Sequence, residues 1–205
     1  MFKIPLPKWG IDLAYKFVDL EADGRANRLE NRVYEYSFVL PRIIRLEAGR
    51  LLDIGCVARM NMIPAVICDV GWLVWGIDTR DYRYEHCNFE FIKGDIRGLA
   101  GFQDFFDVVT AVSTIEHIGI RGRYGVKDRD KSGDIKAIDQ AHRILKSGGK
   151  LLLTLPTGEK TSITNLEKIY APQDVRTLLS AWDITYFESI TNDGDSTLLV
   201  EATKI

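Results

Sequence analysis

Short apolar runs recur along the chain and predict the buried strands of one sheet. The predicted strands lie at residues 51–54, 72–78, 88–95, 106–112 and 150–156. The fourth run is continuous in apolar residues, as expected of a central parallel strand that is covered on both faces. Two further runs, at 183–190 and 196–203, flank the turn sequence TNDGD and predict a pair of strands. The pattern therefore predicts seven strands.

Between these runs, apolar residues recur at helical spacing. The predicted helices lie at residues 27–49, 63–71, 133–149 and 171–182. Pro41 predicts a kink or break in the first helix, and Gly49 is its expected end. Ser132 or Asp134 is the expected N-cap of the third helix, which the glycine pair at 148–149 should end.

Strands that alternate with helices predict an α/β fold, with a doubly wound, mostly parallel seven-stranded Rossmann-like sheet and helices on both faces. We expect residues 49–205 to form this domain. Residues 1–48 should form an N-terminal segment and a helix, and fold analogy alone suggests that they act as a lid. Alternate apolar residues from Trp9 to Phe17 fit an edge strand, a lid, a membrane-surface contact or a segment packed on the domain.

Acidic and hydroxyl side chains follow the predicted strands. Asp53, Asp78 and Asp95 end three of them, and Ser113 follows a fourth. Because ligands of such folds bind at the carboxyl ends of the strands, we expect these four side chains to gather at a binding site. Asp is also common in turns and helix caps, so any one of them alone has a structural explanation. Three successive strands that end in Asp favour the binding site.

Composition narrows the function classes. The 205 residues are 46% hydrophobic and 27% charged, which suits a single domain with a sizeable core. A formal charge of −2 gives no electrostatic reason to expect a nucleic-acid partner. The three cysteines form no Cys-x-x-Cys pair, so a reduced, cytoplasmic protein is the simplest interpretation, and no metal site is expected at His86 and Cys87. No apolar run reaches the ~18 residues of a membrane helix.

Five sequence segments, taken in order, resemble class I S-adenosylmethionine-dependent methyltransferases. They are RLLDIGC, WGIDTRD, FIKGDI, FDVVTAVSTIEHIG and RILKSGGKLLLTLPTG, and they span residues 50–158. The resemblance implies S-adenosylmethionine as the cofactor and methyl transfer as the activity. The STIEHIG segment, with YG and GD after it, resembles a narrower branch associated with sugar and cell-surface polysaccharide biosynthesis. That branch implies a small-molecule acceptor such as a sugar or a sugar nucleotide.

The resemblance also implies which residues hold the cofactor. Asp78, with Thr79 beside it, would accept hydrogen bonds from the ribose hydroxyls, because a carboxylate can accept from two donors at once. Asp95 would accept from the adenine amino group, while the backbone of Ile96 contacts the ring edge. The methionine end would be surrounded by Asp53, Gly55, Cys56 and the main chain near Ser113.

The first turn departs from the family pattern Gly-x-Gly-x-Gly, of which only Gly55 is present. A side chain at Val57 narrows the approach of the backbone and disfavours a positive φ. Three interpretations remain. The turn is remodelled and still binds, with Arg59 near the methionine carboxylate; or the protein binds a related nucleoside, or binds weakly; or the site is inactive and the protein is a scaffold or binding partner. The three retained Asp residues favour the remodelled turn.

Glu116 and His117, just beyond the fourth predicted strand, are the expected catalytic pair. An imidazole with an ordinary pKa of about 6.5 can accept a proton from the methyl acceptor near neutral pH. The alternative is that this Glu-His pair only holds the loop together through hydrogen bonds. A nicotinamide-dependent oxidoreductase is a poorer interpretation, because the turn GCVARM lacks the G-x-G-x-x-G that such enzymes need.

The loop at residues 119–134 is expected to border the acceptor side of the site. It carries four cations that suit a phosphate or carboxylate group of the acceptor, namely Arg121, Arg123, Lys127 and Arg129. A solvated loop without such a role is the alternative. The N-terminal helix, with Arg32, Tyr34, Glu35 and Tyr36, is expected to cover the cofactor as a lid, on fold analogy alone.

Overall fold

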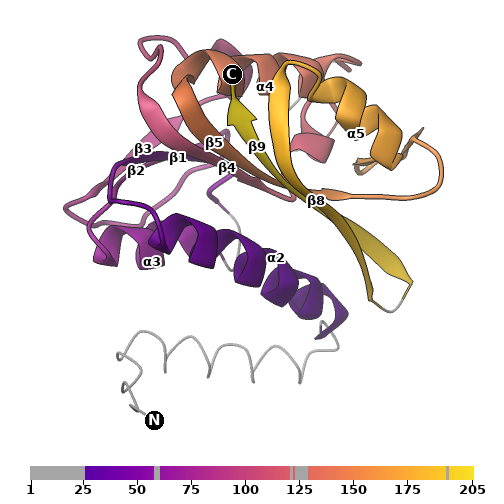
Figure 1. The fold of residues 1–205 in the computed structure, drawn as a ribbon, viewed down its shortest axis with the longest axis horizontal. Helices are drawn as coiled ribbons and strands as arrows, with labels where there is room; N and C mark the ends of the chain where they lie inside the picture. Colours follow the sequence, from indigo (N-terminus) through magenta and orange to yellow (C-terminus); the bar gives the residue numbers. More distant parts are fainter. Residues whose placement is uncertain (1–25, 58–60, 121, 123–128, 193) are drawn as a thin grey trace.

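The computed structural model describes residues 26–57, 61–120, 122, 129–192 and 194–205 (Figure 1). Its helices are α2 (Ala26–Ile44), α3 (Ile63–Asp69), α4 (Gly133–Ile144) and α5 (Pro172–Leu178), with 3-10 turns η1 (Ile96–Gly98) and η2 (Ile115–His117). Its strands are β1 (Arg50–Ile54), β2 (Leu73–Asp78), β3 (Phe89–Lys93), β4 (Phe106–Val112), β5 (Leu145–Pro156), β6 (Ser162–Ile163), β7 (Lys168–Ile169), β8 (Trp182–Asn192) and β9 (Asp195–Lys204). The alternating apolar segment at residues 9–17 and the Arg59 prediction lie outside the described residues.

Seven strands form one sheet in the order β3-β2-β1-β4-β5-β9-β8. The five strands from β3 to β5 are parallel, and β9 runs antiparallel to both of its neighbours. The predicted doubly wound, mostly parallel sheet is therefore confirmed. The register aligns the ends of the central strands: Ile54 pairs with Ile77 of β2 and with Ala111 of β4. The carboxyl ends of these three strands consequently meet at one edge.

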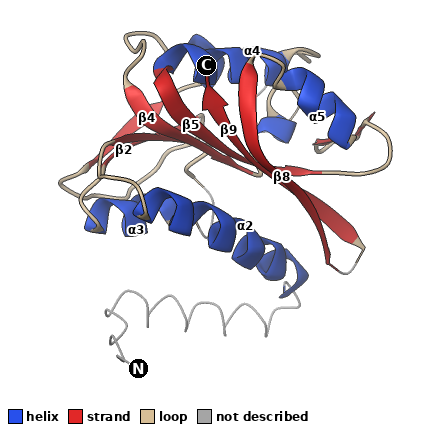
Figure 2. Ribbon diagram, viewed as in Figure 1, coloured by secondary structure: helices blue, strands red, loops and turns tan. Residues whose placement is uncertain are grey.

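Helices cover both faces of the sheet (Figure 2). Side chains alternate between faces along a strand, so Leu51 packs in the cluster with Val39 and Ile67 on the α2 and α3 side. Leu52 points the other way, into the cluster that contains Ile138 of α4 and Val175 of α5. Burial on both faces explains why the central strands are continuous in apolar residues.

The connections on either side of β3 contain no α-helix within the described residues 61–120. Aromatic rings occupy this end of the sheet instead. Tyr82 packs edge-on against Phe89, with ring centroids 5.6 Å apart, and Trp75 packs against Phe105 and Phe106 at 5.4 and 5.5 Å. Large rings bury much area for each residue ordered, so short loops suffice to cover the sheet here.

Helix α2 is anchored to the C-terminal strands. The Arg42 Nε atom donates to Glu201 Oε2 of β9 at 3.1 Å, and the guanidinium lies over the rings of Phe38 (4.0 Å) and Tyr186 (4.5 Å). The helix runs through Pro41 unbroken and ends at Ile44, not at Gly49. The buried side chains of α2 against the sheet outweigh the one backbone hydrogen bond that a proline removes.

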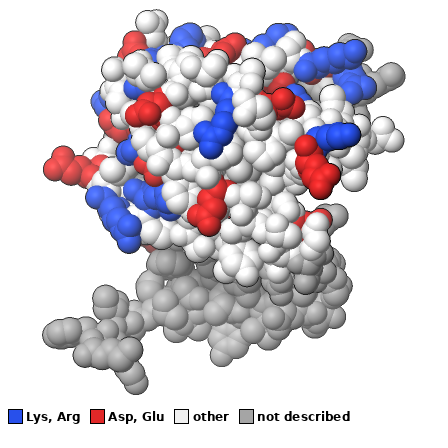
Figure 3. Space-filling model, turned by 45° about the vertical axis from the view of Figure 1, so that its right-hand side comes forward, with Lys and Arg blue, Asp and Glu red and all other residues white. Residues whose placement is uncertain are grey.

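Two other elements differ from the sequence prediction. Helix α4 ends at Ile144 rather than at residues 148–149, because Leu145 already pairs with Phe106 in the sheet. Ser132 is at the N-cap position of α4 but makes no side-chain capping hydrogen bond. The small hairpin of β6 and β7 was not predicted. On the face shown in Figure 3, acidic and basic side chains of the described residues are interspersed.

Candidate functional site

A cavity of about 350 Å³ opens at the carboxyl ends of β1, β2 and β4. Its walls come from the last residues of these strands and the turns that follow them, from the turn after β3, and from one residue of α2. They are formed by Arg32, Ile54, Gly55, Ile77, Asp78, Thr79, Arg80, Gly94, Asp95, Ile96, Val112, Ser113, Thr114, His117, Ile118 and Gly119. Seven of the ten predicted site residues therefore line one cavity. Asp53, Cys56 and Glu116 do not.

Gly55 begins the turn after β1 and needs to be glycine. Its φ is +79°, a region that residues with a side chain rarely adopt, and its N–H donates to the Ile77 carbonyl at 2.8 Å. A Cβ atom here would lie 2.3 Å from Oγ1 of Thr114. The glycine thus lets the turns after β1 and β4 approach each other below the cavity.

Asp78 ends β2 at the cavity wall and is almost fully buried. Oδ1 accepts hydrogen bonds from N and Nε of Arg80, both at 3.0 Å. Oδ2 accepts from Nη2 of Arg80 at 2.8 Å and from the Val57 backbone N–H at 3.1 Å. These four donors fill the acceptor capacity of the carboxylate, so a ligand hydroxyl has to displace the Arg80 side chain to reach it.

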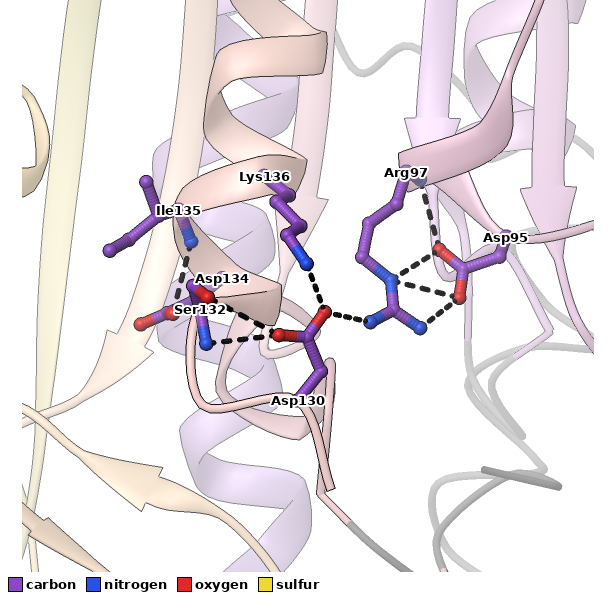
Figure 4. A network of polar contacts seen from close by, with 7 residues as sticks. All are labelled: Asp95, Arg97, Asp130, Ser132, Asp134, Ile135 and Lys136. Atoms are coloured by element: carbon purple, nitrogen blue, oxygen red, sulfur yellow. Dashed lines mark hydrogen bonds and ion pairs between the residues drawn. The ribbon is translucent and has the colours of Figure 1, made fainter. Parts of the chain in front are cut away.

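Asp95 follows β3 and caps η1. Burial alone would raise its pKa, but hydrogen bonds from the backbone and guanidinium of Arg97 outweigh this and lower the pKa. Nη1 of Arg97 also donates to Asp130 at 2.7 Å, and Lys136 of α4 donates to the same oxygen (Figure 4). The network joins the turn after β3 to the segment that leads into α4.

Asp53 is buried beneath the first turn. Oδ1 accepts from Oγ1 of Thr110, its neighbour in the β1–β4 register, at 2.7 Å, and Oδ2 accepts from Nδ2 of Asn61. Asn61 also donates to the Cys56 carbonyl at 3.0 Å. Burial raises the pKa of Asp53 to about 6, although both hydrogen bonds act in the opposite direction. Asp53 therefore supports the turn from behind, and the buried thiol of Cys56 lies there with it.

Helix α2 contributes the guanidinium of Arg32 to the cavity wall beside the end of β4, and the carboxylate of Glu35 is bonded to it. Oε1 of the buried Glu35 accepts from the hydroxyls of Ser113 and Thr154. Nη1 of Arg32 donates to Oε2 of Glu35 at 3.0 Å and to the Val112 carbonyl at 3.2 Å. Ser113 has a φ of +44°, which is unusual for a residue with a side chain, and these contacts help to hold it there.

His117 lines the cavity, with Glu116 buried behind it. Nδ1 of His117 is 2.8 Å from the Leu166 carbonyl oxygen in the β6–β7 hairpin, so this nitrogen carries the proton of the neutral ring. Nε2 lies 3.8 Å from Oε1 of Glu116. The other oxygen of Glu116, Oε2, has no hydrogen-bond partner among the described residues. Burial, with Glu35 nearby, raises the pKa of Glu116 well above its ordinary value.

Three of the four cations predicted for the acceptor loop, Arg121, Arg123 and Lys127, lie outside the described residues, and Arg129 is exposed. Among the residues that the structure covers, no group of three His, Cys, Asp or Glu side chains is arranged to hold a metal ion. None of the described helices combines the length and the apolar character needed to span a bilayer.

The fold is that of class I S-adenosylmethionine-dependent methyltransferases. The 1,6-didemethyltoxoflavin-N1-methyltransferase of Burkholderia thailandensis, solved with S-adenosylhomocysteine, has a TM-score of 0.64 and 14% identity, over 99% of this chain and 93% of that one. The N-methyltransferase NodS of Bradyrhizobium japonicum, also solved with S-adenosylhomocysteine, has a TM-score of 0.61 and 16% identity over 84% and 86%.

The same fold also supports other chemistry. The [4+2]-cyclase SpnF has a TM-score of 0.60 and 15% identity, over 88% of this chain and 81% of that one. Identities this low establish the fold and leave the activity to the site itself. No curated protein matches the sequence. A family model matches residues 88–204, and the chain therefore belongs to the family described as "Caenorhabditis protein of unknown function, DUF268".

Proposed function

We propose that this protein binds S-adenosylmethionine in the cavity and transfers its methyl group to a small-molecule acceptor. The observation that carries the proposal is the charge arrangement within one cavity. Asp78 and Asp95 follow β2 and β3, on one side of β1, whereas Arg32 is bonded to the carbonyl of Val112 at the end of β4, on the other side of β1. Carboxylate oxygens can accept hydrogen bonds from the ribose hydroxyls and the adenine amino group of a nucleoside, and a guanidinium can bind a carboxylate. A ligand with a nucleoside at one end and an amino acid at the other matches this order.

The residues around the cavity fit that cofactor. Asp78 would accept from the ribose hydroxyls once Arg80 has moved aside. Asp95, whose two oxygens accept from the backbone and guanidinium of Arg97, would accept from the adenine amino group once that guanidinium has shifted. Nη1 of Arg32 is held by Glu35 and Val112, and the guanidinium has three further N–H donors on Nε and Nη2. We propose that these donors bind the carboxylate of the cofactor.

S-adenosylmethionine supplies, when bound, both the methyl group and a sulfur leaving group that takes the bonding electron pair. The protein then has to align the acceptor and remove its proton. We assign proton removal to Nε2 of His117, because the Leu166 carbonyl holds the ring proton on Nδ1. Glu116 lies 3.8 Å from Nε2, and because burial raises the pKa of this carboxyl, it would stabilise the imidazolium only after losing its own proton.

We further propose that the acceptor is a sugar or a sugar nucleotide, on the basis of the STIEHIG resemblance and the cations of the loop after β4. The three free cysteines fit a reducing compartment, and a cytoplasmic location is part of the proposal. Incubation with radiolabelled S-adenosylmethionine and a panel of sugar nucleotides tests the acceptor. If the methyl group were transferred only to amines added to the panel, the sugar proposal would be wrong and the methyl-transfer proposal would stand.

A catalytically inactive binding protein is the second candidate. The observation that favours it is the Arg80 side chain, which occupies both oxygens of Asp78. Titration calorimetry with S-adenosylmethionine and S-adenosylhomocysteine separates the two candidates. Micromolar binding that is lost or weakened tenfold or more in Asp78→Ala supports the methyltransferase. A folded protein that binds neither compound would favour the second candidate.

A further inference from the structure

We infer that Thr164, at the tip of the β6–β7 hairpin, is a positioning residue that sets which nitrogen of His117 carries the proton. The catalytic consequence of this inference depends on the function proposed above. Its structural content concerns the state of an imidazole and does not depend on methyl transfer.

The tip of the hairpin is built around the Thr164 side chain. Oγ1 accepts hydrogen bonds from the backbone N–H groups of Leu166 and Glu167, both at 3.0 Å, and donates to the Glu167 carbonyl at 3.0 Å. The Thr164 backbone N–H donates to the same carbonyl at 2.9 Å. One hydroxyl therefore contacts three successive peptide groups of the turn at residues 164–167.

One of these peptide groups is the one that faces the candidate base. The Leu166 carbonyl and the Glu167 N–H belong to the same planar peptide unit and point in opposite directions. Because Thr164 holds the N–H on its own side, the carbonyl oxygen is directed away from Thr164. That oxygen lies 2.8 Å from Nδ1 of His117. Loss of the hydroxyl frees this peptide unit to rotate, and the acceptor for Nδ1–H is then no longer fixed.

The base of the hairpin is held independently of Thr164. Oγ1 of Thr157 donates to the Tyr170 carbonyl at 2.7 Å, and the Tyr170 hydroxyl donates to Asp134 of α4 at 3.0 Å. Lys168 donates to the same Asp134 oxygen at 2.6 Å. Removal of the Thr164 hydroxyl should therefore alter the tip and leave the hairpin attached to the domain.

The consequence is a defined basic atom. With the proton on Nδ1, Nε2 of His117 has the lone pair that would take the acceptor proton, and it is the nitrogen nearer to Glu116. A ring with the opposite tautomer would present an N–H at that position and would accept no proton there. The hairpin tip thus determines whether the ring can act as a base.

The test is the tautomer of His117, read from long-range ¹H–¹⁵N spectra of histidine-labelled protein above pH 8. The chain has three histidines, and His117→Gln assigns the signal. We expect the wild type and Thr164→Ser to carry the proton on Nδ1, and Thr164→Val to show a mixture or the Nε2–H form. Wild type with the Nε2–H form, or Thr164→Val indistinguishable from wild type, would overturn the inference.

Thr161→Val is a matched control. Thr161 is also a threonine whose hydroxyl bonds within this segment, to Asp174 and to the Ala171 N–H, but it does not touch the 166–167 peptide group. Thr161→Val should leave the His117 tautomer unchanged. If it changes the tautomer as much as Thr164→Val does, the effect is due to general loosening of the hairpin, and the inference is overturned.

A methyl-transfer assay adds the catalytic arm. We expect Thr164→Val to lower kcat roughly tenfold or more with unchanged affinity for S-adenosylhomocysteine, and Thr164→Ser to restore it. If the tautomers are as expected but the wild type binds no cofactor, the proposed function is refuted and the inference stands. If the wild type binds the cofactor and transfers the methyl group but has the other tautomer, the inference is refuted and the proposed function stands.

Discussion

Replacement of the buried Asp53 by Asn should stabilise the protein at neutral pH. Asn can keep every hydrogen bond at this position. Its carbonyl oxygen accepts from Asn61, and its amide donates to Oγ1 of Thr110, whose hydroxyl can both accept and donate. The Thr110 proton then turns to the Leu52 carbonyl, 3.5 Å away. The substitution therefore removes a buried charge and keeps both hydrogen bonds, while the second N–H of the new amide gains no partner from them.

The size of the effect follows from the pKa. Burial raises the pKa of Asp53 from 3.8 to about 6, a shift of about 2 units. Each unit corresponds to ~1.4 kcal/mol, so ionised Asp53 costs on the order of 3 kcal/mol of folding free energy above pH 6. Because the folded pKa is the higher one, the folded state binds the extra proton. Stability from this group is complete below pH 4 and is lost as the pH rises through 6.

Urea unfolding of wild type and Asp53→Asn at pH 4.5, 6 and 7.5 measures this directly. Other carboxylates affect both proteins alike, so the difference between them isolates position 53. We expect the difference between the two proteins to change by about 2 kcal/mol in favour of Asn between pH 4.5 and pH 7.5. A difference that does not change with pH, or a variant that is less stable at pH 7.5, would refute the reasoning.

Three further predictions concern the cavity. Arg80→Ala should tighten S-adenosylhomocysteine binding up to about fivefold in calorimetry, because the Arg80 side chain is 39% exposed and its displacement from Asp78 costs at most about 1 kcal/mol; weaker binding would mean that Arg80 contacts the ligand. Gly55→Ala should lower the free energy of unfolding by about 2 kcal/mol or more in urea, whereas Gly98→Ala, with open space around it, should not; equal losses would contradict this. Arg97→Gln should raise the pKa of Asp95 in an NMR titration, and an unchanged pKa would show that the hydrogen bonds from Arg97 do not cause the shift.

Local sequence patterns predicted the sheet well because β1 to β4 are short, and because apolar runs separated by turn residues mark its strands. The fourth strand was predicted at residues 106–112 and forms there as β4. The β6–β7 hairpin was not predicted because strands of two residues are too short to show a periodicity in the sequence. The end of α4 was misplaced because pairing of Leu145 with Phe106, distant in sequence, outweighed the glycine signal at 148–149.

The sequence predicted most of the residues that share the cavity, but it did not predict the direction in which each side chain faces. Strand ends brought Asp78, Asp95 and Ser113 to one cavity, as the fold rule requires. Which way a carboxylate faces depends on partners elsewhere in the chain. Asp53 is held by Thr110, 57 positions away, and Ser113 is bonded to Glu35, 78 positions away. Such pairs have no local signature, so the sequence alone did not show that Asp53 lies behind the turn.

The anchoring of α2 to β9 makes the cavity a late product of folding. Arg42 and Glu201 are 159 positions apart, and the helix that they fix also carries Arg32. Loops closed over such distances form slowly relative to local contacts. A nascent chain without β9 would lack the Arg42–Glu201 contact, and α2 would be held only by its contacts with α3 and the strands before β9. Affinity for a ligand that carries both charges would then reach its full value only after the last strand has paired, and refolding experiments that follow this affinity would time that step.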